Sequence, residues 1–206
     1  MKSPGKKAMA ALAGVALGAC ATLSTAFAQD AVRIRGTIER VEGAICLVKT
    51  RDGADVKVML GDNPSIAGVV KASLADIKQG SFVGVTAMPQ PDGSQRALEV
   101  HIFTEAMRGT GEGHYPWDLQ PRSTMTNANV EQAVTAVDGQ TLALKYKGGE
   151  QKIFVPASTP IVVYVPGDKS DLKPGAKVFI TAVKQPDGTL QGRAWRVGKD
   201  GATPPM

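Results

Sequence analysis

Hydrophobic and polar residues alternate along much of this chain, which is the pattern of β-strands with one buried face. The alternation is clearest in residues 32–39 and 98–102. The only helical turns that the pattern predicts are Ser73–Lys78 and Ser170–Lys173. Dipeptides typical of tight hairpins separate the alternating segments: Glu42-Gly43, Asp52-Gly53, Asp92-Gly93, Asp138-Gly139, Gly148-Gly149 and Asp187-Gly188. Short strands joined by such turns predict an all-β barrel or sandwich.

The chain also contains an internal repeat. Asp76–Met88 returns as Asp171–Val183, 95 residues later, and the tetrapeptide Gln-Pro-Asp-Gly at 90–93 recurs at 185–188. Self-similarity over this length indicates that one structural unit is present twice. We therefore expect an internal duplication.

Each repeated unit holds five or six predicted strands, which favours a small closed barrel of the oligonucleotide/oligosaccharide-binding (OB) type, since closure leaves no exposed edge strand. We expect two tandem OB-like β-barrels after a cleaved signal peptide. The expected division is a signal peptide (1–28), a first barrel (29–103), a joining segment (104–128), a second barrel (129–198) and a tail (199–206). The pattern leaves open whether the barrels are independent or share a core.

Several short patterns resemble a bacterial family of exported OB-like barrel domains of unknown function: Gly36-x-Ile38, Val41-x-Gly43 and Leu47-x-Lys49, followed by the Lys-x-Gly turn and the Asp-Gly hairpin. The whole chain is similar to tandem-barrel exported proteins of alphaproteobacteria, and residues 105–129 and the closing Pro204-Pro205-Met206 carry much of this similarity. This resemblance implies an exported two-barrel protein and implies no particular activity.

The first 28 residues predict an export signal. Lys2, Lys6 and Lys7 form a positive start, an apolar stretch follows, and Ala26-Phe27-Ala28 is a site that signal peptidase cuts. The alternative is a lipoprotein signal, because Leu17-Gly18-Ala19-Cys20 resembles a lipobox in which Cys20 would carry the lipid. Cleavage after Ala28 predicts a periplasmic or secreted protein, and lipidation of Cys20 predicts an exported lipoprotein that is anchored to a membrane.

Composition and charge narrow the classes of partner. The formal net charge is +5, but the three lysines of the signal contribute to it while all acidic residues lie beyond residue 28, so the cleaved chain carries +2. Such a weak charge with 5% aromatic residues is not typical of nucleic-acid binding, which needs a basic groove with stacking aromatics. No later segment has the roughly 20 apolar residues that span a bilayer.

The repeat also gives an interpretation of two reactive residues. Cys46 is the only cysteine beyond the signal, and 96 residues later the chain has Leu142, so we expect Cys46 in the core. His101 lies on the polar side of the last strand of the first unit and corresponds to Arg196. We expect His101 to be a solvated surface residue.

The joining segment 104–128 is the part of the sequence in which we expect a functional site. Its mixture of glycines, charges and aromatics differs from a monotonous spacer. It is expected either to be pinned between the barrels by its aromatic residues or to contact a partner. The candidate partner-binding residues are Arg108, Glu112, His114, Tyr115, Trp117 and Asp118.

Two other functions stay open besides a binding module. Imidazole and thioether ligands suit copper, so a copper or zinc site could use His101, Met107, His114 and Met125. An unrecognised hydrolase could use Glu112 and Asp118 as paired carboxylates, although no familiar catalytic motif is present. We expect a non-enzymatic binding module whose partner is a cell-envelope protein or a small ligand.

Overall fold

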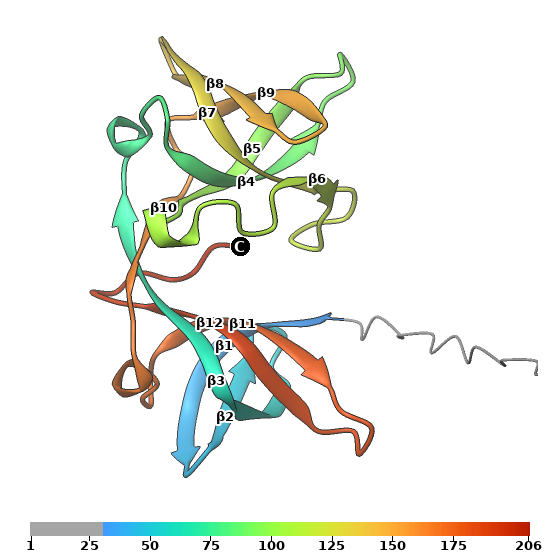
Figure 1. The fold of residues 1–206 in the computed structure, drawn as a ribbon, viewed down its shortest axis with the longest axis vertical. Helices are drawn as coiled ribbons and strands as arrows, with labels where there is room; N and C mark the ends of the chain where they lie inside the picture. Colours follow the sequence, from blue (N-terminus) through green and yellow to red (C-terminus); the bar gives the residue numbers. More distant parts are fainter. Residues whose placement is uncertain (1–30) are drawn as a thin grey trace, which may run out of the picture.

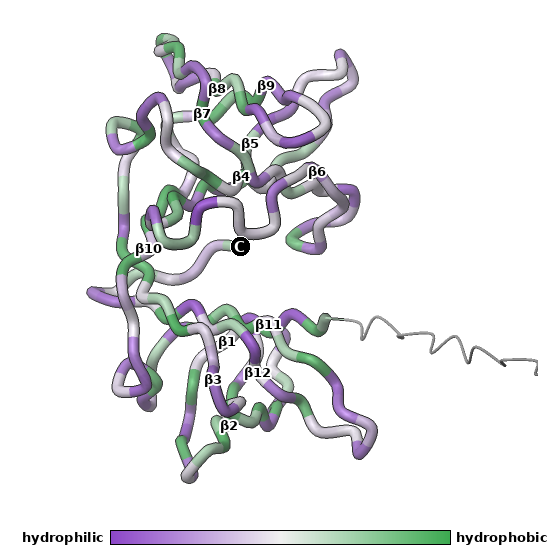
Figure 2. Tube along the Cα trace, in the orientation of Figure 1, coloured by the Kyte–Doolittle hydropathy of each residue, from purple (hydrophilic) through white to green (hydrophobic). Residues whose placement is uncertain are grey.

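The structure is a computed structural model that describes residues 31–206. The predicted signal peptide and the Cys20 alternative lie outside these residues. Strands form nearly all of the regular structure, and the three helical elements of the described range are single 3-10 turns. This confirms the predicted all-β barrel fold. Hydrophobic and hydrophilic residues alternate along the strands, as the sequence pattern indicates (Figure 2).

Five strands close the first barrel, which we call barrel A, in the order β12-β11-β1-β2-β3 and back to β12. β1 pairs antiparallel with β11, and β3 pairs parallel with β12, as in an OB-like barrel. The strands are β1 (Ala31–Glu42), β2 (Ile45–Thr50), β3 (Asp55–Ala72), β11 (Lys177–Lys184) and β12 (Leu190–Gly198).

Five other strands form a second ring, barrel B, in the order β5-β4-β7-β8-β9. A short parallel pairing of β5 with β9 closes this ring. The strands are β4 (Phe82–Pro89), β5 (Gln95–Ile102), β7 (Thr124–Ala136), β8 (Gly139–Tyr146) and β9 (Gly149–Pro156). The two barrels lie one above the other in Figure 1.

The strand pairing differs from the expected division into a barrel at 29–103 and a barrel at 129–198. Barrel A takes three strands from the first repeated unit and two from the second, and barrel B takes the complementary strands. The physical reason is that β4 and β11 carry equivalent hydrophobic patterns, so both are suitable partners for the first strand of either unit. The alternating pattern therefore predicts that a strand of this type pairs with the first strand of a unit. It does not predict whether the strand comes from the first or the second repeated unit.

Two long connections carry the chain between the barrels. β3 continues from barrel A until it pairs antiparallel with β10 (Ile161–Pro166), and β10 also pairs in parallel with β5. The predicted helical turns follow these strands as η1 (Leu74–Asp76) and η3 (Lys169–Asp171). Side chains cap both turns, since Ser73 bonds to Asp76 and the Ser170 N–H donates to Asp168. The ribbon of β3 and β10 therefore joins the two barrels.

Three hydrophobic clusters hold the fold together. One fills barrel B, a second fills barrel A, and a third lies between the barrels. The third includes Val69 and Tyr164 from the connecting strands, Met125 from barrel B, Phe179 from barrel A and Met206. The barrels therefore share a core, which answers the question that the sequence left open.

The predicted tail, 199–206, packs between the barrels (Figure 1). The Met206 side chain is only 1% exposed, and Arg35 Nε donates to the Met206 backbone oxygen over 2.7 Å. Arg51 similarly donates to the Pro204 carbonyl. Met206 thus makes the end of this tail part of the shared core. No helix within residues 31–206 is long and apolar enough to cross a membrane.

Candidate functional site

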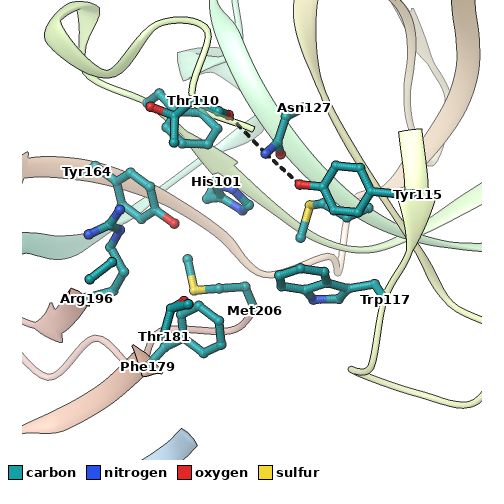
Figure 3. Close-up of a pocket in the computed structure, with 13 residues that line it drawn as sticks. His101, Thr110, Tyr115, Trp117, Asn127, Tyr164, Phe179, Thr181, Arg196 and Met206 are labelled. Atoms are coloured by element: carbon teal, nitrogen blue, oxygen red, sulfur yellow. Dashed lines mark hydrogen bonds between the residues drawn. The ribbon is translucent and has the colours of Figure 1, made fainter. Parts of the chain in front are cut away.

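A cavity of about 100 Å³ lies between the barrels, and we call it the inter-barrel cavity. Strands β5, β7, β10, β11 and β12, the joining segment and Met206 all contribute side chains to its wall (Figure 3). Its lining residues include His101, Tyr115, Trp117, Met125, Asn127, Tyr164, Ala194, Arg196 and Met206. Because the wall combines both barrels, the exchange of strands creates this site.

The joining segment contains η2 (Glu105–Met107) and β6 (Gly113–Pro116), and β6 pairs with β7. In that pairing Tyr115 lies opposite Met125, and His114 lies opposite Thr126. Neighbouring residues of a strand point to opposite faces. Tyr115 and Trp117 therefore line the cavity, while His114 faces away from it.

Two of the predicted partner-binding residues, Arg108 and Glu112, fasten this segment to barrel B. Arg108 binds the Gly80 carbonyl, Glu105 and the side chain of Asn129. A carboxylate oxygen of Glu112 accepts a hydrogen bond from the Lys147 N–H. The aromatic residues Tyr115 and Trp117 pack against the cluster between the barrels, where the sequence placed them if the segment was a pinned linker.

Asp118 connects the end of the segment to barrel A. Its carboxylate lies 2.6 Å from Arg35 and 3.5 Å from Arg33, both on β1. Burial by itself would raise the pKa of this carboxyl, but the hydrogen bond from Arg35 and the charges of Arg35 and Arg33 outweigh it and lower the pKa. The Arg33 guanidinium also lies 4.0 Å from the centre of the Trp117 ring. Since Glu112 and Asp118 both hold structural partners, their contacts do not favour a pair of catalytic carboxylates.

The His114 side chain lies outside the cavity and contacts strands of barrel B. Its Nδ1 lies 2.8 Å from the Thr126 hydroxyl, and its ring stacks at 6.4 Å from Tyr146. Burial lowers the pKa of this imidazole. The structure thus separates His114 from the other histidine.

His101 is buried, at 3% exposure, and the expectation of a solvated histidine is wrong. One face of β5 packs into barrel B, and the cluster between the barrels covers the end of the other face, so Glu99 and His101 are shielded from solvent. The imidazole Nδ1 lies 3.2 and 3.3 Å from the two carboxylate oxygens of Glu99. Thr86 donates to Glu99 over 2.5 Å, and the His101 ring stacks on Tyr164 with centroids 5.2 Å apart. His101 is therefore held in one orientation.

Asn127 is also buried, and its amide nitrogen has two partners, the Thr110 carbonyl and the Tyr115 hydroxyl. A carbonyl can only accept, so the amide nitrogen points to Thr110 and the amide oxygen, Oδ1, points the other way. This Oδ1 is buried and has no hydrogen-bond partner. A Cβ at Gly84 would lie 2.5 Å from Oδ1 and 2.0 Å from His101 Nε2, so both atoms lie over Gly84.

The other side of the cavity holds Arg196 and Tyr164. The Arg196 guanidinium lies 5.1 Å from the centre of the Tyr164 ring, and Nη1 donates to the Trp195 carbonyl. Burial raises the pKa of the Tyr164 phenol far above its usual range, so the phenol stays neutral. His101 and Arg196, which correspond in the repeat, thus line one cavity.

Sequence reasoning missed the buried partners of this site, namely Glu99, Asn127, Tyr164, Arg196 and Met206. One signal in the sequence could have indicated this site. His101 corresponds to Arg196 in the repeat, and two polar residues at equivalent strand positions would lie near each other if the repeated units exchanged strands. Cys46 is buried in barrel A as predicted, and burial raises the pKa of its thiol.

The four residues of the predicted metal set are divided by the structure. His101 and Met125 line the cavity, Met107 packs against the cluster between the barrels, and His114 lies elsewhere. Within residues 31–206 there is no group of three or more His, Cys, Asp or Glu side chains that could hold a metal ion.

Comparisons of the chain with family models, with curated proteins and with solved structures gave no match. The resemblance to exported bacterial barrel domains therefore stays a prediction. The fold and site define the protein as an all-β chain of exchanged barrels with a cavity between them.

Proposed function

We propose that this protein is a non-enzymatic binding protein of the cell envelope that encloses a small ligand in the inter-barrel cavity. The observation that carries the proposal is the unpaired Asn127 Oδ1, which is buried beside the oriented imidazole of His101. An unsatisfied buried acceptor costs about 1–3 kcal/mol. A ligand with a positive charge or a hydrogen-bond donor would recover this free energy on binding.

The size of the cavity supports a very small ligand. Sites for organic ligands usually enclose roughly 300–1,000 Å³, whereas this cavity has about 100 Å³. An ion or a molecule of a few atoms fits that volume. A small ligand is therefore favoured over the envelope protein that the sequence also allowed as partner.

The joining segment would act as the wall that closes the cavity. Tyr115 and Trp117 point their rings towards it, and the contacts of Arg108 and Asp118 hold the segment in place. The envelope location rests on the signal features of residues 1–28.

Native mass spectrometry of the protein, purified without chelators from the cells in which it occurs, tests this function. The expected result is a mass above that of the chain. Ala194→Leu should remove the additional mass, since Ala194 lines the cavity and leucine would fill part of it. Ala54→Leu changes an exposed alanine by the same amount and should keep it. A bare chain, or an adduct that Ala194→Leu retains, would overturn the proposal.

A further inference from the structure

The chemistry of the cavity wall identifies the class of ligand. We propose that the inter-barrel cavity binds a soft monovalent metal cation, copper(I), through the imidazole of His101 and the thioethers of Met125 and Met206. This inference rests on the proposed function and gives its ligand. The three residues come from β5, from β7 and from the end of the packed tail, and all three line the cavity.

His101 is prepared as a ligand by its partner Glu99. A carboxylate only accepts hydrogen bonds, so the proton of the imidazole lies on Nδ1, which faces Glu99 at 3.2 and 3.3 Å. The lone pair is then on Nε2. A carboxylate behind a histidine is the usual second-shell arrangement of metal sites, because it fixes the tautomer and raises the basicity of the ligand.

One electron donor near Nε2, the amide oxygen of Asn127, lacks a partner. Asn127 Oδ1 lies with Nε2 over Gly84, and no hydrogen bond joins the two. Two lone pairs side by side repel each other unless a cation stands near both. Gly84 is necessary here, because any Cβ would overlap with both atoms.

The two thioethers decide which cation is suitable. Met125 and Met206 are 2% and 1% exposed, so their sulfur atoms lie in a dry environment. Thioethers are soft ligands that select copper(I), whereas oxygen ligands suit harder ions. In Figure 3 the Met206 side chain reaches into the space between Tyr164 and Trp117, below His101.

Charge near the cavity favours a monovalent ion over a divalent one. Arg196 lines the same cavity and places a fixed positive charge there. The aromatic rings of Tyr115, Trp117 and Tyr164 cover the site, and their faces attract cations. A single positive charge is therefore easier to accommodate than two.

The test uses silver(I), which is a redox-inert substitute for copper(I), and protein purified after expression of the full chain. With methyl-labelled methionine, one equivalent of silver(I) should shift the Met125 and Met206 signals and leave the Met59 signal unchanged. Met59 is 40% exposed and lies outside the cavity, so it is the internal control. A shift of Met59 alone, or no shift at all, would overturn the inference.

Affinity for copper(I), measured by competition with a coloured chelator under reducing conditions, tests the ligands one by one. Met125→Leu and Met206→Leu keep the volume of the side chain and should each weaken binding roughly tenfold or more, and Glu99→Gln should weaken it by about tenfold. Met59→Leu should have no effect. Cys46→Ala should also have none, which excludes the buried thiol in barrel A as the binding group. Equal affinity in the two cavity variants and in the wild type would contradict the site.

The outcomes separate this inference from the proposed function. If native mass spectrometry finds an organic adduct that Ala194→Leu removes, while silver(I) leaves Met125 and Met206 unchanged, the binding function stands and the copper(I) inference is overturned. If neither an adduct nor silver(I) reaches the cavity, both are overturned.

Discussion

Val69 on β3 and Tyr164 on β10 lie directly opposite each other in the antiparallel ladder that joins the barrels, and they are 95 residues apart in the chain. This is the offset of the sequence repeat. The two connections therefore cross at equivalent positions, and each one carries its unit into the opposite barrel. Tyr164 also stacks on His101, so the crossing point is one wall of the cavity.

The exchange predicts that neither half of the chain folds alone. The fragment 31–103 lacks the partners that β1 and β3 have in β11 and β12, and the fragment 104–206 lacks β4 and β5. Each fragment should show no cooperative unfolding as a monomer, and their mixture should form a one-to-one complex. Circular dichroism and size-exclusion chromatography with light scattering measure this. A monomeric 31–103 that unfolds cooperatively would contradict the strand exchange.

Gly84→Ala should destabilise the protein by about 1–3 kcal/mol, the usual cost of overpacking. The added Cβ would overlap with His101 Nε2 and Asn127 Oδ1, at 2.0 and 2.5 Å. Gly61→Ala is the matched control, because its Cβ would meet its nearest neighbour at 3.4 Å. Urea unfolding of both variants gives the free energies. The prediction fails if the two glycines tolerate alanine equally well.

Met206→Ala should lower the free energy of unfolding by roughly 2 kcal/mol or more, as for other buried methionines. The side chain is 1% exposed and packs in the cluster that both barrels share. Met59→Ala removes the same atoms from a methionine that is 40% exposed and should cost less than about 0.5 kcal/mol. Equal costs would show that the tail does not support the shared core.

Asp118→Asn should cost about 0.5–1 kcal/mol at neutral pH, a value reduced for the partial exposure of its ion pairs. The folded-state pKa of this carboxyl is lowered, so its contribution is present above the unfolded pKa of about 4 and is lost as the pH falls through the folded pKa. Urea unfolding at pH 7 and near pH 3 measures the difference. Asp55→Asn removes a more exposed pair with Lys49 and should cost less. A constant cost at both pH values would argue against the ion pairs.

His114→Gln should flatten the pH dependence of stability between about pH 7 and 5. Burial lowers the folded-state pKa of His114, so below the unfolded pKa of about 6.5 the unfolded chain binds more protons than the folded one. The wild type therefore loses stability as the pH falls through that value, and the variant should lose less. Urea unfolding at pH 7.5 and 5.5 compares them. Identical losses would refute a role for His114.

Much of the fold could be predicted from the sequence because strands and hairpins are local. The turns at Gly43 and Gly188 have the positive φ values that their Asp/Glu-Gly dipeptides indicate, and Cys46 is buried like its counterpart Leu142. The strand with which another strand pairs can be far away in the sequence, so a local pattern does not identify it. Val83 on β4 and Val178 on β11 are equivalent in pattern, so alternation cannot assign either one to a barrel.

The site was harder to predict than the strands, since its parts come from distant segments. Alternation along one strand places His101 and Glu99 on a polar face, but it carries no information about a second barrel that covers this face. Met206 lies in a short stretch with no periodicity, so its burial had no signal. Ligand chemistry, which does not depend on the fold, made His101 and Met125 candidates in the sequence, and both line the cavity.

The exchange of strands also sets an order of assembly. Barrel B uses strands that end at residue 156, so it can form while the rest of the chain is still being made. Barrel A joins β1, which begins at Ala31, to β11 and β12, which begin at Lys177 and Leu190. The edges of β1 and β3 stay unpaired until β11 and β12 have been made. Contacts between residues so far apart in the sequence form slowly. The cavity between the barrels is therefore completed last.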